Sequence, residues 1–298
     1  MNGLLKTAMD AALRAGGAIL EIYKRDFEVE FKADASPLTE ADKAAHHIIC
    51  DALEDTGLPI LSEESKAIDC EERKAWEKYW LVDPLDGTKE FIKKNGEFTV
   101  NIALIEDGRP VMGVVYAPVL GIVYCGMSDA ESGISKAWKS SECPGKSVDE
   151  VIASSVSLPT SNIQHSTIRV VASRSHCNDE TKAFIAELEK EGRVELVLSG
   201  SSLKLCLVAE GSADVYPRIA PTMEWDTAAA QAVVEASAGQ VVKYDPAVPA
   251  ASYLCGKLDV EGGAADVLHP TSHIPHLTEA LSYNKADLLN PSFVVSRF

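Results

Sequence analysis

Two aspartates, Asp83 and Asp86, lie three residues apart in the stretch WLVDPLDGTKE, where an apolar segment ends. Pro84 between them restricts the backbone, so that both carboxylates could face one centre, and the carbonyl group of Leu85 could add a third oxygen. Hard cations such as Mg²⁺ prefer such all-oxygen ligand sets. An acidic turn at a strand end is the plainer alternative, because aspartate is common in turns.

The residues that follow could bind a phosphate beside that cation. Gly87 lets the backbone approach a ligand closely. If Asp86-Gly87-Thr88 opens a helix, its unpaired N–H groups can bind phosphate oxygens. Two-metal phosphoryl hydrolysis needs the metal ions and the phosphate to be bound next to each other, as these residues would allow.

Two further acidic features come at the ends of apolar segments. Glu63 and Glu64 end the stretch LPILSEES, and Asp226 precedes the segment TAAAQAVVEA. Taken singly, each favours a structural explanation. Asp226 would complement the dipole at a helix N-terminus, and Glu64 would be a solvated neighbour. Only together do they suggest a shared metal site.

Helical and strand periodicity alternate along the chain and predict a mixed α/β protein. A helix is expected over 4–24, and a second begins after Thr39, with Asp42 completing a pattern close to a capping box. Further helices are expected over about 178–191, 201–211 and 224–239. Strands are expected over 58–65, 80–88, 98–105, 110–118, 169–176, 194–200 and 213–217. The turn at Asp107-Gly108 predicts an antiparallel hairpin.

The weakly patterned stretch 126–165 is where we place a boundary between two lobes. The N-terminal lobe, 1–155, carries most of the predicted metal ligands. The C-terminal lobe, 156–298, carries Asp226.

The composition of the chain argues against several classes of function. The 298 residues carry a formal net charge of -17, which argues against nucleic-acid binding and makes recruited cations necessary for an anionic substrate. The seven cysteines include no CxxC pair, which favours a reducing cytoplasm. Charges at Lys6, Asp10 and Arg14 interrupt the first apolar segment and argue against a signal peptide. No run is long enough to span a membrane. Peripheral association with the inner face of the cell membrane is a further expectation.

The segments LSEES, WLVDPLDGTKEF and EWDTAAAQAVVEASAG resemble the three metal-binding motifs of the inositol monophosphatase superfamily, which are Mg²⁺-dependent, lithium-sensitive phosphatases. Within it, SPLTEAD, GSSLKLCLVAEGSADVYPR and LLNPSF resemble the 3'(2'),5'-bisphosphate nucleotidases of the CysQ type, enzymes of sulfur metabolism. The resemblance implies a layered α-β-α-β-α sandwich like that of inositol monophosphatase and fructose-1,6-bisphosphatase.

The resemblance also assigns roles to positions of this chain. It implies two or three Mg²⁺ ions, with Asp83 bridging two of them and Asp86 and Asp226 holding the second. The implied metal ligands are Glu63, Asp83, Leu85 through its carbonyl oxygen, Asp86 and Asp226. Asp42 and Thr88 are the implied catalytic pair that orients and deprotonates a metal-activated water.

Substrate contacts are implied at the same centre and at a second group of residues. Around the metals they are Glu63, Leu85, Asp86, Gly87, Thr88 and Asp226. For the nucleotide and its second phosphate they are Ser201, Ser202, Lys204 and Arg218. An Arg suits a second phosphate because its planar guanidinium can bind it through two hydrogen bonds.

The resulting hypothesis is hydrolysis of the 3'-phosphate of adenosine 3',5'-bisphosphate to AMP and phosphate. A related substrate would be 3'-phosphoadenosine 5'-phosphosulfate. Two alternatives stay open: an inositol monophosphatase or other small sugar-phosphate phosphatase, and a non-catalytic, metal-dependent nucleotide-binding protein.

Overall fold

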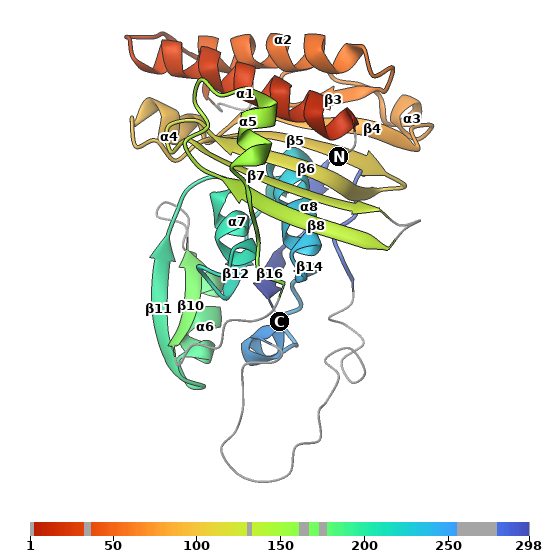
Figure 1. Cartoon of the computed structure of the whole chain (residues 1–298). Coiled ribbons are helices and arrows are strands. Elements are labelled where there is room, and N and C mark those ends of the chain that lie inside the picture. The colour runs from red at the N-terminus through yellow and green to blue at the C-terminus, as the bar shows by residue number, and fades with distance from the viewer. Residues whose placement is uncertain are drawn as a thin grey trace.

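The computed structural model describes residues 3–32, 37–129, 133–160, 167–172, 178–254 and 279–297. It has alternating layers of helix, sheet, helix, sheet and helix, as expected for the predicted sandwich (Figure 1). The α-helices are α1 (Gly3–Tyr23), α2 (Glu40–Glu54), α3 (Cys70–Arg73), α4 (Thr88–Ile92), α5 (Val148–Ala153), α6 (Asp179–Leu188), α7 (Leu203–Ala209) and α8 (Ala228–Ala236). Two 3-10 helices are η1 (Glu224–Asp226) and η2 (Ala250–Leu254).

The first sheet has seven strands in the order β3-β4-β5-β6-β7-β8-β9. The strands are β3 (Ile60–Ser62), β4 (Lys78–Asp86), β5 (Thr99–Glu106), β6 (Arg109–Ala117), β7 (Ile122–Asp129), β8 (Ile134–Ser140) and β9 (Val156–Ser157). β3 and β4 are parallel, and the other neighbours are antiparallel. The pairing of β5 with β6 confirms the predicted hairpin.

The second sheet is mixed and has five strands in the order β11-β10-β12-β16-β14. They are β10 (Thr167–Ala172), β11 (Arg193–Leu198), β12 (Val215–Arg218), β14 (Gly239–Lys243) and β16 (Phe293–Arg297). Two short antiparallel pairs lie outside both sheets: β1 (Val29–Phe31) with β2 (Pro37–Thr39), and β13 (Thr222–Met223) with β15 (Leu289–Asn290). The expected strand over 169–176 is described as far as Ala172, and its remaining residues lie outside the described ranges.

The layers enclose three apolar cores. α1 and α2 pack on the outer face of the seven-stranded sheet, with Trp80 fully buried between them and the strands. α7 and α8 fill the space between the two sheets, where Val233 and Val295 belong to the same core. α6 and η2 cover the far face of the second sheet. Burial on both faces explains why the central strands read as nearly continuous apolar runs.

Helix α8 lies unusually close to the seven-stranded sheet. A Cβ atom added to Gly113 of β6 would come within 2.0 Å of the carbonyl oxygen of Ala229, and one added to Gly126 of β7 within 2.5 Å of that of Ala232. Glycine in the strands and alanine in the helix permit this approach. Asp226 comes directly before α8, so its height above the sheet is fixed by the same packing.

The stretch 126–165 has more regular structure than its weak pattern suggests. The end of β7, then β8, α5 and β9 all lie in it, and all three strands belong to the first sheet. The chain changes sheets between Ser157 and Thr167. α8 nevertheless packs on the first sheet, so the division into lobes at about residue 155 stays an interpretation.

Candidate metal centre and adjoining pocket

An irregularity in β4 brings Asp83 and Asp86 to the same side. Two residues three apart in a regular strand point to opposite faces. Here the pairing with β5 shifts between Asp83, opposite Asn101, and Asp86, opposite Thr99. Pro84 lies at the shift and has no N–H to donate to the ladder. The sequence DPLD therefore places both carboxylates at one centre.

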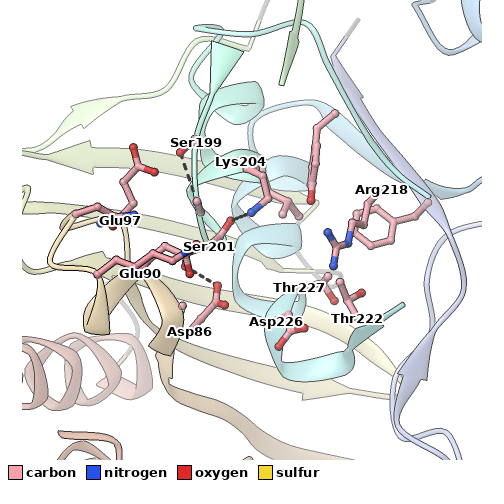
Figure 2. Close-up of a pocket in the computed structure, with 17 residues that line it drawn as sticks. Asp86, Glu90, Glu97, Ser199, Ser201, Lys204, Arg218, Thr222, Asp226 and Thr227 are labelled. Atoms are coloured by element: carbon pink, nitrogen blue, oxygen red, sulfur yellow. Dashed lines mark hydrogen bonds between the residues drawn. The ribbon is translucent and has the colours of Figure 1, made fainter. Parts of the chain in front are cut away.

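Asp226, from the C-terminal half of the chain, lies beside these two acids. It is the last residue of η1, and carboxylate oxygens of Asp83, Asp86 and Asp226 all lie within 4.8 Å of one another. Figure 2 shows Asp86 and Asp226 at the floor of one pocket. The predicted convergence of these three acids is thus present in the geometry.

The hydrogen bonds of these acids leave oxygen atoms available for a cation. Asp83 Oδ1 accepts from the Leu85 N–H at 3.0 Å, and Asp226 Oδ2 accepts from the Met223 N–H at 2.9 Å. Asp83 is only 1% exposed, yet within the described part of the chain its Oδ2 has no hydrogen-bond partner. A buried carboxylate oxygen without a partner is costly, and a divalent cation would satisfy it. The residues present therefore fit a hard metal ion.

The mutual repulsion of the acids supports the same assignment. Burial, reinforced by the charges of Glu63 and Asp86, raises the pKa of Asp83 well above its usual range. Desolvation and the charge of Asp86 raise the pKa of Asp226 to about 8. Carboxylates that resist ionisation together are stabilised as anions by a bound cation.

We expect the metal-free protein to lose stability as the pH rises from about 5 to about 8. The folded-state pKa of Asp226, about 8, exceeds the value near 3.9 of an unfolded chain, so the folded state binds the proton more tightly across this window. The measurement is the thermal midpoint in EDTA at several pH values. Saturating Mg²⁺ should remove most of the fall, and Asp226→Asn should reduce it. A midpoint that rises through the window in EDTA would contradict the expectation.

Glu63 lies beside this group but makes a different contact. Its carboxylate accepts from the Lys32 ammonium at 2.8 Å, and the same ammonium contacts Glu64 at 2.6 Å. Burial raises the pKa of Glu63, and Lys32 opposes that shift. Glu64 is therefore an ion-pair partner rather than a solvated neighbour. The role of Glu63 as a metal ligand stays a prediction.

The catalytic pair implied by the sequence is in contact. Thr88 Oγ1 donates to Asp42 Oδ1 at 3.2 Å, and Asp42 Oδ2 accepts from the N–H and hydroxyl of Thr39 at 2.7 and 2.6 Å. The capping box at the start of α2 therefore also orients Asp42. Gly87, with φ of 94°, precedes Thr88, the first residue of α4. The strand expected over 80–88 therefore ends at Asp86, and the condition for phosphate binding, a helix that opens at DGT, is met. A side chain would strain this left-handed backbone.

A cavity of about 290 Å³ adjoins the acids and includes most of the residues predicted to contact a nucleotide. Ser201, Lys204 and Arg218 line it together with Asp86 and Asp226 (Figure 2). Lys204 Nζ donates to the Ser201 carbonyl oxygen at 2.6 Å, and burial lowers the pKa of this lysine. Arg218 donates to the Pro221 carbonyl oxygen at 3.1 Å. The cavity thus has Asp86 and Asp226 at its floor, and Lys204 and Arg218 are among the basic side chains that line it.

The two serines contact the acids directly. Asp86 Oδ2 accepts from the Ser201 hydroxyl and from the Ser202 N–H, the latter at 2.7 Å. Ser201 is one of the described residues that line the cavity, whereas Ser202 is not.

Sequence reasoning missed several residues of this site. Lys32, Thr99, Asn101 and Tyr216 were not singled out, although Tyr216 lines the cavity and Lys32 pairs with Glu63. Asn101 lies directly across from Asp83 in the sheet, so strand register could have indicated it once the hairpin was assigned. Nothing in the local sequence around Lys32 indicates its partners, which lie 31 and 32 residues further along the chain.

This chain belongs to the inositol monophosphatase family, whose sequence profile matches residues 1–278. The 3'(2'),5'-bisphosphate nucleotidases CysQ of Escherichia coli K12 and Shigella flexneri are each 47% identical to it over 242 residues, which is 80% of this chain and 89% of theirs. The crystal structure of CysQ from Bacteroides thetaiotaomicron is 45% identical, with a TM-score of 0.76, and the match covers 98% of this chain and 96% of that one. An inositol monophosphatase of Thermotoga maritima, 20% identical with a TM-score of 0.61, shares the fold.

A search of the described helices finds none with the length and hydrophobicity needed to cross a bilayer. Cytoplasmic location and peripheral membrane association stay predictions.

Proposed function

We propose that this protein hydrolyses the 3'-phosphate of adenosine 3',5'-bisphosphate to AMP and phosphate with the help of Mg²⁺. The observation that carries the proposal is a three-carboxylate centre within 4.8 Å that opens into the same cavity as Lys204 and Arg218. A monophosphate ester would need only the first of these features. A bisphosphate needs both, one for each phosphate. The similarity to the CysQ nucleotidases supports the same choice.

The residues divide the chemistry between them. Asp83, Asp86 and Asp226 would hold the cations, with Glu63 and the Leu85 carbonyl oxygen as further ligands. When bound, the cations would acidify a water molecule and neutralise charge on the scissile phosphate. The N–H groups of Gly87 and Thr88 would bind that phosphate. As the water attacks phosphorus and the bond to the ribose 3'-oxygen breaks, Asp42, held by Thr39, would receive the proton of the water through the Thr88 hydroxyl. The released 3'-oxygen would take up a proton from solvent.

The second phosphate would lie against Lys204 and Arg218. Arg218 Nε is buried and, in the part of the chain that the structure describes, lacks a hydrogen-bond partner, so an anion would satisfy it. Related bisphosphates such as 3'-phosphoadenosine 5'-phosphosulfate would use the same contacts.

A parallel assay tests the proposal. Purified protein with Mg²⁺ is given adenosine 3',5'-bisphosphate and inositol 1-phosphate separately, and phosphate release is measured. We expect the bisphosphate to be hydrolysed with the higher kcat/KM and EDTA to abolish the activity. Faster turnover of the inositol ester would favour an inositol monophosphatase. No turnover of either would favour a non-catalytic binding protein.

We expect Arg218→Gln to raise KM for adenosine 3',5'-bisphosphate by about 10-fold or more, because a charge-assisted contact to the second phosphate is lost. KM for a slow monophosphate substrate such as 3'-AMP should change much less. Steady-state kinetics on both substrates make the measurement. The exposed Arg193→Gln, on β11, is the matched control. Equal effects on both substrates would place Arg218 outside the second-phosphate site.

A further inference from the structure

Ser202 is a buried serine at the start of α7 whose hydroxyl does not cap the helix. Ser202 is 2% exposed, and within the described helix its side chain makes no capping hydrogen bond. Serine at this position normally accepts from a free N–H of the first turn. The described lining of the cavity includes Ser199, Ser201 and Lys204 but not Ser202 (Figure 2). Its hydroxyl therefore serves something other than the helix or a ligand in the cavity.

The Ser202 hydroxyl joins three segments of the metal centre. It accepts from Asn101 Nδ2 of β5 at 2.9 Å. Its single proton is shared between the main-chain oxygen of Asp226, at 2.6 Å, and Asp86 Oδ2, at 2.9 Å. The Ser202 N–H adds a further bond to Asp86 Oδ2 at 2.7 Å. One residue thus contacts both acids that are predicted to hold the second metal.

These contacts oppose a repulsion that the metal-free centre must withstand. Oxygen atoms of the Asp86 and Asp226 carboxyl groups lie within 4.8 Å of each other. When both groups are ionised and no cation is bound, moving apart lowers their electrostatic repulsion. Ser202 fixes the side chain of Asp86 and the main chain of Asp226. Asn101, which lies opposite Asp83 on β5, in turn fixes the Ser202 hydroxyl. Ligands that are held in place before binding cost less to order when the cation arrives.

We propose that Ser202 is a positioning residue of the metal centre, which holds Asp86 and Asp226 at binding distance, and that it does not contact the nucleotide. This inference rests on the metal-dependent chemistry proposed above and deepens it. It differs from the expectation drawn from the sequence, which grouped Ser202 with the nucleotide contacts. Ser201 differs from Ser202, because it contacts Asp86 and also lines the cavity, so a contact with the nucleotide stays a prediction for Ser201.

The test measures metal affinity directly in full-length protein. Mn²⁺ binding to apo-protein is followed by electron paramagnetic resonance, without any substrate. We expect Ser202→Ala to weaken Mn²⁺ binding by about 10-fold or more, the usual effect of losing a hydrogen bond to a metal ligand. KM for adenosine 3',5'-bisphosphate at saturating Mg²⁺ should stay within about twofold of wild type. A raised KM with unchanged Mn²⁺ affinity would overturn the proposal and make Ser202 a nucleotide contact.

Two variants serve as controls. Ser237→Ala removes another fully buried serine hydroxyl, which donates to the Val234 carbonyl oxygen at 2.9 Å in α8, and should leave Mn²⁺ affinity unchanged. Asn101→Ala acts on the same hydroxyl from the other side. It should weaken Mn²⁺ binding less than Ser202→Ala, and the two effects should be non-additive in the double variant.

The outcomes separate this inference from the proposed activity. If Ser202→Ala does not fold, the Asn101→Ala measurement decides, since unchanged Mn²⁺ affinity in that variant would overturn the proposal. Equal Mn²⁺ affinities in Ser202→Ala and Ser237→Ala would do so as well. If the wild-type protein binds Mn²⁺ but does not hydrolyse the nucleotide, the proposed activity fails while the comparison of affinities still stands.

Discussion

Asp83→Asn should lower the rate of phosphate release by on the order of 10³-fold or more, while the protein stays folded. Asp83 is buried, its Oδ2 lacks a hydrogen-bond partner in the described part of the chain, and its pKa is raised by burial and by four other acids. Replacing it with an amide removes a charge that a cation would bind. It also removes a charge that the metal-free protein tolerates poorly. The same change should thus abolish activity and leave stability in EDTA equal to or above that of wild type.

Two measurements on the same samples check this result. Phosphate release is assayed over a range of Mg²⁺ concentrations, and the thermal midpoint is recorded with and without EDTA. The wild-type midpoint should rise on addition of Mg²⁺, and that of Asp83→Asn should rise much less. Asp51→Asn, an exposed position on α2, supplies the same substitution away from the centre. Retained Mg²⁺-dependent turnover in Asp83→Asn would show that the metal centre lies elsewhere.

Thr88→Ala should lower kcat by about 10²- to 10³-fold with little change in Mn²⁺ affinity. The Thr88 hydroxyl links Asp42 to the turn that we propose binds the phosphate, and its loss removes the proposed path for the proton. Thr88→Ser keeps the hydroxyl and should recover most of the activity. The backbone N–H that would bind the phosphate is present in all three proteins, so a difference between them isolates the hydroxyl.

The rates should be followed with pH as well. Thr88→Ser should retain the shape of the wild-type profile of kcat against pH, and Thr88→Ala should lose the limb that depends on Asp42. Thr7→Ala, in α1, where the hydroxyl donates to the Gly3 carbonyl oxygen, is the matched control. Full activity in Thr88→Ala would remove this residue from the mechanism.

Local sequence predicted the helices and strands that carry the site better than it predicted how those elements come together in space. The capping pattern at Thr39 and Asp42 depends on neighbouring residues and is present as expected, and the helix that we considered at DGT is present as well. The meeting of Asp83 with Asp226 depends on the stacking of α8 on the first sheet. No spacing in the chain encodes that distance, and it was reached through the resemblance of three motifs.

Other features could not be predicted because they depend on contacts between distant segments. The resemblance implied ligand contacts at Ser201 and Ser202 and gave no sign of their bonds to Asp86, which arise from packing between α7 and the end of β4. β8 was not expected as a strand. Its first three residues, Ile134, Ser135 and Lys136, are all exposed, so apolar and polar residues do not alternate between a buried and an exposed face there.

The close seating of α8 on Gly113 and Gly126 has a consequence for how ligands come and go. A protein whose ligands are gripped between two lobes can release them by swinging the lobes apart. Here the helix that follows Asp226 approaches the backbone of the first sheet at Gly113 and Gly126, and neither of these positions has a side chain to separate them. Opening along that boundary would break a continuous apolar core. Cations and products should therefore exchange through the mouth of the cavity, with α8 and the sheet acting as a rigid floor beneath them.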